Sequence, residues 1–230
     1  DTALDSVEAG GINNVAIGDH AGTAITTGDC NVAVGKSALE ATTTASDNVA
    51  IGFRALCTNT TGYSNISIGS YSSDANTEGF ENIAIGVSSL GANTTGDCNV
   101  GVGRNALRSN TTAGDNTAIG TNALCSNTTG CINVAVGEDA MKANTTGEFN
   151  AAMGSGAMQT NTTGGENTGS GYNALALNTT GCKNSAFGKS SLESNTTADC
   201  NTAVGYNALK ANTTGTQNTA VGSGALDSNT

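Results

Sequence analysis

Apolar and polar positions recur along the chain with a period of seventeen residues. An asparagine opens each copy, a triplet with a small central residue, such as Val49-Ala50-Ile51 or Thr202-Ala203-Val204, follows it, and a glycine such as Gly52 comes next. Alternation of this kind is typical of a short β-strand, whose successive side chains point to opposite faces. A glycine that always follows the triplet indicates a corner that needs positive φ or a close backbone approach.

We number the repeat from its asparagine, so that the triplet fills positions two to four. Position five is glycine and position thirteen is threonine in all thirteen copies, and no copy contains an insertion or a deletion. The asparagines at position one are Asn14, Asn31, Asn48, Asn65, Asn82, Asn99, Asn116, Asn133, Asn150, Asn167, Asn184, Asn201 and Asn218.

The period selects one class of fold. Helix-pair repeats and propeller blades need about 33 to 50 residues, whereas seventeen suit one coil of a β-solenoid. We therefore predict an all-β fold, a parallel β-solenoid (β-roll) of about thirteen stacked 17-residue coils over residues 14–230. Residues 1–13 are expected to form an irregular leading segment or a partial coil, and the array is interpreted as part of a longer one.

The rest of the coil consists of positions six to eleven and the Asn-Thr-Thr-Gly segment that follows them. Positions six to eleven, such as residues 206–211, fit either a second strand or one helical turn, and the sequence does not decide between them. The Asn-Thr-Thr-Gly that follows is turn chemistry, because Asn and Thr bond local backbone and Gly tolerates unusual dihedral angles. Stacking would place the position-one asparagines above one another, and we expect them to form a hydrogen-bonded ladder.

Position three is only ever Ala, Ser or Gly. One interpretation is that a small residue allows close contact with another chain. The other is that it points into a narrow single-chain coil. Because each coil has only about two sizeable apolar side chains to offset the entropy of ordering it, we favour association with another chain.

The segments NVAIGDHAG, NVAIGFRAL and NTAVGYNAL resemble the head repeat of YadA-type trimeric autotransporter adhesins. With NTTG included, the unit is also similar to repeats of bacterial and phage fibre proteins that carry a self-cleaving chaperone domain. The resemblance runs from about residue 14 to the end. It implies a left-handed parallel β-roll, usually trimeric, in a surface fibre or adhesin. The adhesin repeat is nearer fourteen residues and usually poor in cysteine, so the NTT loop and the cysteines here are departures.

Charge excludes some partners. The formal net charge is −11, with only eight Lys plus Arg. Phosphate recognition needs a basic face, so we expect no nucleic-acid partner. No apolar run approaches the roughly 20 residues of a membrane span, so we expect no membrane insertion.

Seven cysteines occupy positions ten, sixteen and seventeen, on either side of the Asn-Thr-Thr-Gly loop. Cys125 and Cys131 bracket one loop and form the first candidate disulfide. Cys182 and Cys200 lie in consecutive coils and form the second. Free buried thiols are the alternative. Disulfides would indicate an oxidising, extracellular setting.

Asn-Thr-Thr sequons recur in register, and they would coat one edge of the solenoid with sugar in a glycosylating host. The alternative is that Asn-Thr-Thr-Gly is only a good turn. The candidate asparagines are Asn59, Asn93, Asn110, Asn127, Asn144, Asn161, Asn178, Asn195 and Asn212.

Nothing in the repeats singles out a catalytic group. The carboxylates lie at turn positions, which favours a solvated acidic edge over a glycosidase pair or a calcium site. His20 is the only histidine, so we expect no enzyme activity, no metal site and no cofactor. The leading hypothesis is an extracellular structural protein at a cell or virion surface, which forms a rigid fibre by self-association and carries glycans and disulfides on its loops. An adhesin stalk or head is the alternative, and an ice-binding solenoid that uses the threonines of position thirteen is a lesser one.

Overall fold

The computed structural model describes residue 3 and residues 11–229, and it confirms the predicted fold class. The protein is an all-β, parallel β-solenoid with one three-residue strand in every 17-residue coil and no helix among the described residues. The predicted leading segment, residues 1–13, lies largely outside the described residues. The single solenoid over residues 14–230 stays a prediction, and the fold is that of two compact units, Asp1–Asp115 and Asn116–Thr230, each taken by itself.

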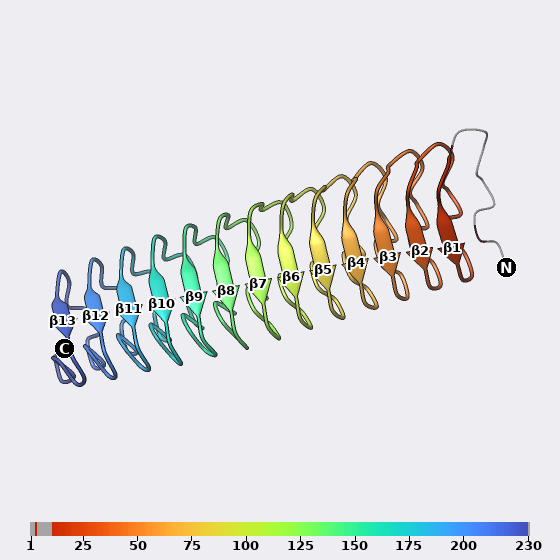
Figure 1. Cartoon of the computed structure of the whole chain (residues 1–230). Helices are drawn as coiled ribbons and strands as arrows, with labels where there is room; N and C mark the ends of the chain where they lie inside the picture. Colours follow the sequence, from red (N-terminus) through yellow and green to blue (C-terminus); the bar gives the residue numbers. More distant parts are fainter. Residues whose placement is uncertain (1–2, 4–10, 230) are drawn as a thin grey trace. The chain divides into compact units, whose positions relative to one another are not determined.

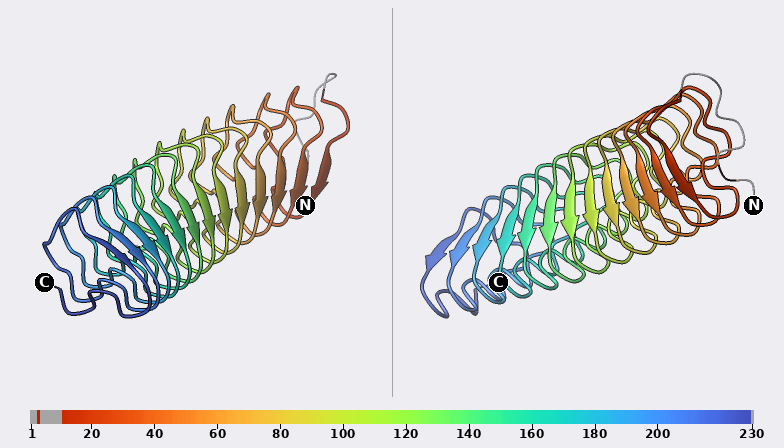
Figure 2. Two further views of the ribbon diagram at one scale, coloured as in Figure 1. Left: turned by 60° about the vertical axis from the view of Figure 1, so that its left-hand side comes forward. Right: turned by 45° about the vertical axis from the view of Figure 1, so that its right-hand side comes forward.

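Each unit is a stack of coils in chain order, with the strands side by side along one wall (Figures 1 and 2). The first unit contains β1 (Val15–Ile17), β2 (Val32–Val34), β3 (Val49–Ile51), β4 (Ile66–Ile68), β5 (Ile83–Ile85) and β6 (Val100–Val102). The second unit contains β7 (Thr117–Ile119), β8 (Val134–Val136), β9 (Ala151–Met153), β10 (Thr168–Ser170), β11 (Ser185–Phe187), β12 (Thr202–Val204) and β13 (Thr219–Val221).

Neighbouring strands within a unit pair in parallel with a register of one repeat. Val49 in β3 lies opposite Ile66 in β4, for example, and Ala151 in β9 lies opposite Thr168 in β10. The turns between strands are hydrogen-bonded from coil to coil as well: the Thr60 N–H donates to the Thr77 carbonyl at 2.9 Å. Equivalent residues therefore lie above one another around the whole coil, which is why a strict period in the sequence produces a regular stack.

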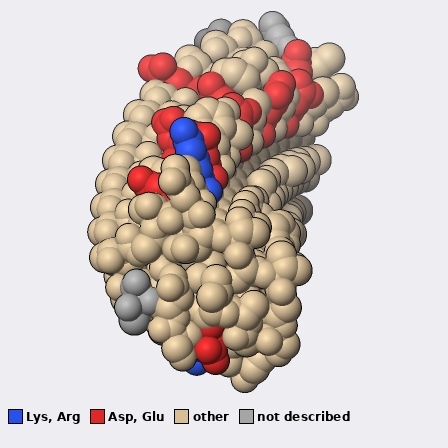
Figure 3. Space-filling model, turned by 90° about the vertical axis from the view of Figure 1, so that its left-hand side faces the viewer, with Lys and Arg blue, Asp and Glu red and all other residues tan. Residues whose placement is uncertain are grey.

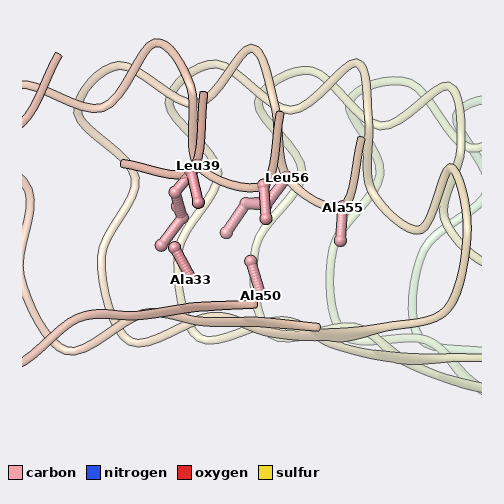
Figure 4. Packing of buried hydrophobic residues seen from close by; sticks show 7 residues of the cluster. Ala33, Leu39, Ala50, Ala55 and Leu56 are labelled. Carbon is pink, nitrogen blue, oxygen red and sulfur yellow. The ribbon is translucent and has the colours of Figure 1, made fainter. Parts of the chain in front are cut away.

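The core is a column of small side chains on one wall and larger ones on the other. Ala33 and Ala50, at position three, point inward from the strand wall, and Leu39 and Leu56, at position nine, point toward them from the opposite wall (Figure 4). All four residues are fully buried. Ala38 and Ala55, at position eight, are fully buried in the same cluster, so each of these coils contributes two alanines and one leucine to a narrow interior.

The small residue at position three packs inside its own coil. Ala152 and Ala186 are fully buried, and even at Gly169 an added Cβ would lie 3.0 Å from Met158 Cγ of the coil below. The preferred interpretation of position three, as a contact with another chain, is therefore wrong. The narrow coil interior explains its small side chain instead.

Enlarging an inward residue of a strand is expected to destabilise the coil, whereas enlarging its outward neighbour is not. Ala152→Ile should cost about 1–3 kcal/mol, because overpacking a filled core displaces its neighbours. Ala151→Ile, one residue earlier on the other face of β9, should be neutral or slightly stabilising, since isoleucine suits strands. Urea unfolding followed by circular dichroism compares the two variants. Equal losses would contradict the inward direction of position three.

Position five forms the predicted corner: φ is +133° at Gly137 and lies between +124° and +141° at the twelve other glycines of this position. Positions six to eleven form neither a strand nor a regular helix. In most coils the residues at positions seven, nine and seventeen adopt left-handed φ, as at Asn173 (φ 55°), Leu175 (φ 53°) and Lys183 (φ 59°). Such values are uncommon for residues other than glycine, so the turns of each coil are held by the stack around them.

Candidate functional site

The asparagines of position one form a ladder inside each unit. Asn48 Nδ2 donates to Asn31 Oδ1 of the preceding coil at 3.3 Å and to the Gly62 carbonyl at 3.0 Å. The backbone N–H of Asn48 donates to the same Asn31 oxygen at 3.0 Å. Asn48 Oδ1 in turn accepts from the backbone N–H of Asn65. This first asparagine column thus links successive coils and fastens the turn that precedes each strand.

A second asparagine column lies at position twelve, and it contains all nine sequon asparagines. Asn144 Nδ2 donates to Asn127 Oδ1 at 2.8 Å and to the Gly147 carbonyl at 3.0 Å, and Asn144 Oδ1 accepts from Asn161 Nδ2 at 2.9 Å. The second asparagine column comprises Asn59, Asn76, Asn93 and Asn110 in the first unit, and Asn127, Asn144, Asn161, Asn178, Asn195, Asn212 and Asn229 in the second.

The sequon asparagines do not fit the prediction of N-linked sugar on the folded coil. Asn59, Asn93, Asn110, Asn127, Asn144, Asn161, Asn178, Asn195 and Asn212 are each at most 1% exposed. A glycan would have to be attached to Nδ2, the atom that donates the hydrogen bonds of the column. The buried ladder explains why Asn recurs at this position. This agrees with the alternative that Asn-Thr-Thr-Gly is a turn, and it adds a hydrogen bond from each coil to the next.

The predicted disulfides are not formed: none of the seven cysteines, all within the described residues, is disulfide-bonded. Cys182 and Cys200 have adjacent backbones, because the Cys200 N–H donates to the Cys182 carbonyl. The Cys182 thiol, however, lies 3.4 Å from the backbone nitrogen of Gly165, in the coil on the other side. Cys131 Sγ donates to the Thr129 carbonyl at 3.5 Å rather than bonding Cys125.

Cysteines at the three positions differ in exposure. Cys57 is buried, and burial raises the pKa of its thiol, whereas Cys30 and Cys200 are exposed.

The outward side chains of the strands form an apolar surface. Because position three points inward, positions two and four point out, and in the first unit both are always Val or Ile. Ile51 and Ile85 are each 38% exposed although they lie in mid-stack. We call this surface the outer strand face of the first unit, and it consists of Val15, Ile17, Val32, Val34, Val49, Ile51, Ile66, Ile68, Ile83, Ile85, Val100 and Val102.

The corresponding wall of the second unit is chemically mixed. Position four is apolar in every coil except the one with Ser170, but position two is Thr, Ser or Ala in all coils except the one with Val134. Only the first unit therefore has Val or Ile at both outward positions, two and four, of every strand.

The outer strand face was not predicted from the sequence. The alternation showed that positions two and four lie opposite position three, but not which side was inside. The size of the residue at position three was the signal that could have decided this. Because only Ala, Ser or Gly occurs there, position three faces a narrow interior, and the larger residues at positions two and four must face outward.

The charged side chains lie at the turns. Lys36 Nζ is 3.2 Å from Asp19 Oδ2, and its hydrogen bond holds the pKa of that carboxyl below its ordinary value. His20, 3.6 Å from Asp19, stands at the same turn. Over the described ranges, no group of three or more His, Cys, Asp or Glu side chains could hold a metal ion. In that same part of the chain, there is no helix of sufficient length and apolar character to cross a membrane.

Comparison with known proteins gives no match at a significant level. No protein-family model matches the chain, and neither a curated protein nor a solved structure is similar to it.

Proposed function

We propose that the chain is a structural protein that associates with further copies of itself through the outer strand face of the first unit to build a stiff fibre. The observation that carries this proposal is the pair of uninterrupted Val and Ile columns on the outside of β1 to β6. Four of the twelve side chains in these columns are exposed and the other eight are partly exposed, and contiguous exposed apolar surface often marks a contact with another molecule.

A second copy of the chain is the occupant that the geometry favours. Its outer strand face has the same repeat along the stack, about 4.8 Å per strand, so the side chains of two copies can interdigitate over many coils in one register. A partner with another period would lose register after a few coils. Twelve side chains are fewer than the 20–30 residues that each side of a typical stable interface contributes, so we expect association to depend on protein concentration.

Charge favours this face over the others. The chain is strongly acidic, and two copies repel each other wherever their carboxylates meet. Asp and Glu gather on one side of the view in Figure 3, and broad areas carry no charged residue. None of the twelve residues of the outer strand face is charged, so its burial would desolvate no ion.

Other parts of the sequence-based hypothesis have less support. The buried sequons and the lack of disulfides at the seven cysteines remove two reasons for an extracellular setting. A location at a cell or virion surface, and the adhesin alternative, therefore depend on the resemblance to YadA-type and fibre repeats. Ice binding was inferred from the threonines of position thirteen. The hydroxyls of that column donate to the backbone of the next coil, as Thr145 Oγ1 does to the Thr162 carbonyl at 3.0 Å, so they are less available to order water.

Introducing charge on the outer strand face is expected to abolish association. Sedimentation velocity over a range of concentrations should show oligomers for the unaltered chain and monomers for Ile51→Lys/Ile85→Lys. Both side chains point outward, so the variant should keep the circular dichroism of the coil while it places two cations in an apolar contact.

The matched control is Thr61→Lys/Thr95→Lys, which makes the same change of charge at two exposed threonines of position fourteen. It should associate like the unaltered chain. A monomeric unaltered chain at every concentration, or equal behaviour of the two double variants, would refute association through this face.

A further inference from the structure

One coil of the first unit lacks a side chain that every other coil has. Position ten is Glu40, Cys57, Asp74 and Arg108 in coils around it, and Gly91 is the only glycine at this position in the chain. The backbone at Gly91 does not require glycine, because its φ lies outside the left-handed region and an added Cβ would meet only ordinary contacts, the nearest at 3.4 Å. Neither backbone conformation nor packing accounts for glycine here.

The missing side chain opens a hollow of about 560 Å³ between neighbouring coils. Gly91 forms part of its lining, and Asp74 and Arg108 occupy the same position in the coils before and after it. The three coils are fastened together by backbone hydrogen bonds from Ala75 N to Gly91 O and from Ala92 N to Arg108 O. The volume lies within the range of small-molecule sites, about 300–1,000 Å³.

The remaining lining is polar and aromatic. Tyr71, Ser88 and Ser109 contribute hydroxyl-bearing side chains, and Tyr71 is 42% exposed. Phe53 packs edge-on against the Tyr71 ring, with centroids 5.2 Å apart, and so restricts its orientation. The hollow therefore combines an aromatic face with hydrogen-bonding groups on several sides.

The two charged groups of the hollow are not neutralised by ion pairs. Each lysine of the chain either pairs with a carboxylate or lies near a tyrosine ring, as Lys189 lies near Tyr172 and Tyr206. Among the described residues, neither Arg108 nor Asp74 forms an ion pair. Burial raises the pKa of the Asp74 carboxyl although the positive charge of Arg54 acts to lower it, so this group is partly withdrawn from water.

We propose that this hollow binds a hexuronic acid unit of an acidic polysaccharide, with its carboxylate on Arg108, its hydroxyls on Asp74 and its ring against Tyr71. The inference goes beyond self-association and does not depend on it, because the lining residues lie at positions seven, ten and eleven rather than on the outer strand face.

Each group of the hollow selects one feature of such a ligand. The planar guanidinium of Arg108 matches a carboxylate with two parallel hydrogen bonds. Asp74 repels a simple anion, but its carboxylate accepts hydrogen bonds from hydroxyls, so an anion that also carries hydroxyls suits the pair. The negative face of the Tyr71 ring attracts the polarised C–H bonds on the flat side of a sugar.

Titration of the full chain with D-glucuronate and with D-glucose, followed by saturation-transfer NMR, tests the proposal. We expect D-glucuronate to bind at least about tenfold more tightly than D-glucose, because only the acid forms the charge-assisted pair with Arg108. Arg108→Ala should weaken D-glucuronate binding by at least about tenfold. Gly91→Lys, which places in the hollow a side chain that position ten accommodates at Lys142 and Lys210, should abolish it.

Two variants serve as matched controls. Arg104→Ala removes the other arginine of the same coil, which does not line the hollow, and Ala176→Lys makes the position-ten change in the second unit. Both should bind D-glucuronate normally, as should Ile51→Lys/Ile85→Lys. The proposal is overturned if D-glucuronate gives no signal, if D-glucose or inorganic phosphate binds equally well, or if Arg104→Ala weakens binding as much as Arg108→Ala.

Discussion

Gly137→Ala is expected to destabilise the second unit by about 3 kcal/mol or more, the largest effect that we predict for a single methyl group. At φ +133° the backbone of Gly137 occupies a region that residues with a side chain rarely enter, which alone costs about 1–3 kcal/mol. A Cβ would also lie 2.6 Å from both the carbonyl carbon and the carbonyl oxygen of Gly154 in the next coil. Those backbone atoms cannot move away alone, because the Gly154 N–H donates to the Val136 carbonyl at 2.8 Å.

Gly91→Ala is the matched control, because the same methyl group there meets no atom closer than 3.4 Å and requires no left-handed φ. It should leave stability unchanged or raise it by about 0.4–1 kcal/mol, through the lower entropy of the unfolded chain. Urea unfolding of both variants gives the comparison. If Gly137→Ala were as stable as Gly91→Ala, the close approach of successive corners would not be a constraint on the stack.

Asn150→Leu should destabilise the second unit by about 2–4 kcal/mol, although leucine is similar in size and more apolar. Asn150 Nδ2 donates to the Gly164 carbonyl at 2.9 Å, and Asn150 Oδ1 accepts from the backbone N–H of Asn167 at 3.0 Å. Leucine leaves the Asn167 N–H buried without its partner, at about 1–3 kcal/mol, whereas the Gly164 carbonyl loses one hydrogen bond but still accepts from Asn161 Nδ2 at 2.9 Å. The bond to Asn133 Oδ1 in the preceding coil is lost as well.

Thr146→Leu controls for the introduction of leucine, since Thr146 is exposed at position fourteen. It should unfold within about 0.5 kcal/mol of the unaltered chain, as surface substitutions usually do. Calorimetry and urea unfolding measure both variants. An unfolding free energy of Asn150→Leu equal to that of Thr146→Leu would show that the first asparagine column adds nothing beyond packing.

The repeat made the solenoid predictable because it recurs without interruption. A strand at Val49–Ile51 and a corner at Gly52 follow from local chemistry that any one copy displays, and thirteen copies remove the ambiguity of so short a segment. The conformation of positions six to eleven could not be predicted, because left-handed φ at Leu56 and Arg54 is imposed by neighbouring coils. The intrinsic backbone preferences of leucine and arginine do not indicate a left-handed φ that neighbouring coils impose.

The roles of single residues were harder to predict, because the same residue type can have either of two roles. Asn144 in Asn-Thr-Thr fits a sugar acceptor and a buried amide equally well, and only its burial separates the two. The hollow at Gly91 gave a sequence signal that was overlooked. Aligning the copies places Asp74, Gly91 and Arg108 in one column, where opposite charges flank a missing side chain.

The left-handed turns have a consequence for how the molecule forms. One isolated coil would hold three residues such as Asn173, Leu175 and Lys183 at unfavourable backbone angles, with few contacts of its own to offset the cost. A coil laid on a finished neighbour finds its hydrogen-bonding partners already in position. Folding should therefore begin with slow nucleation of the first coils and then propagate, with each folded coil serving as the template for the next.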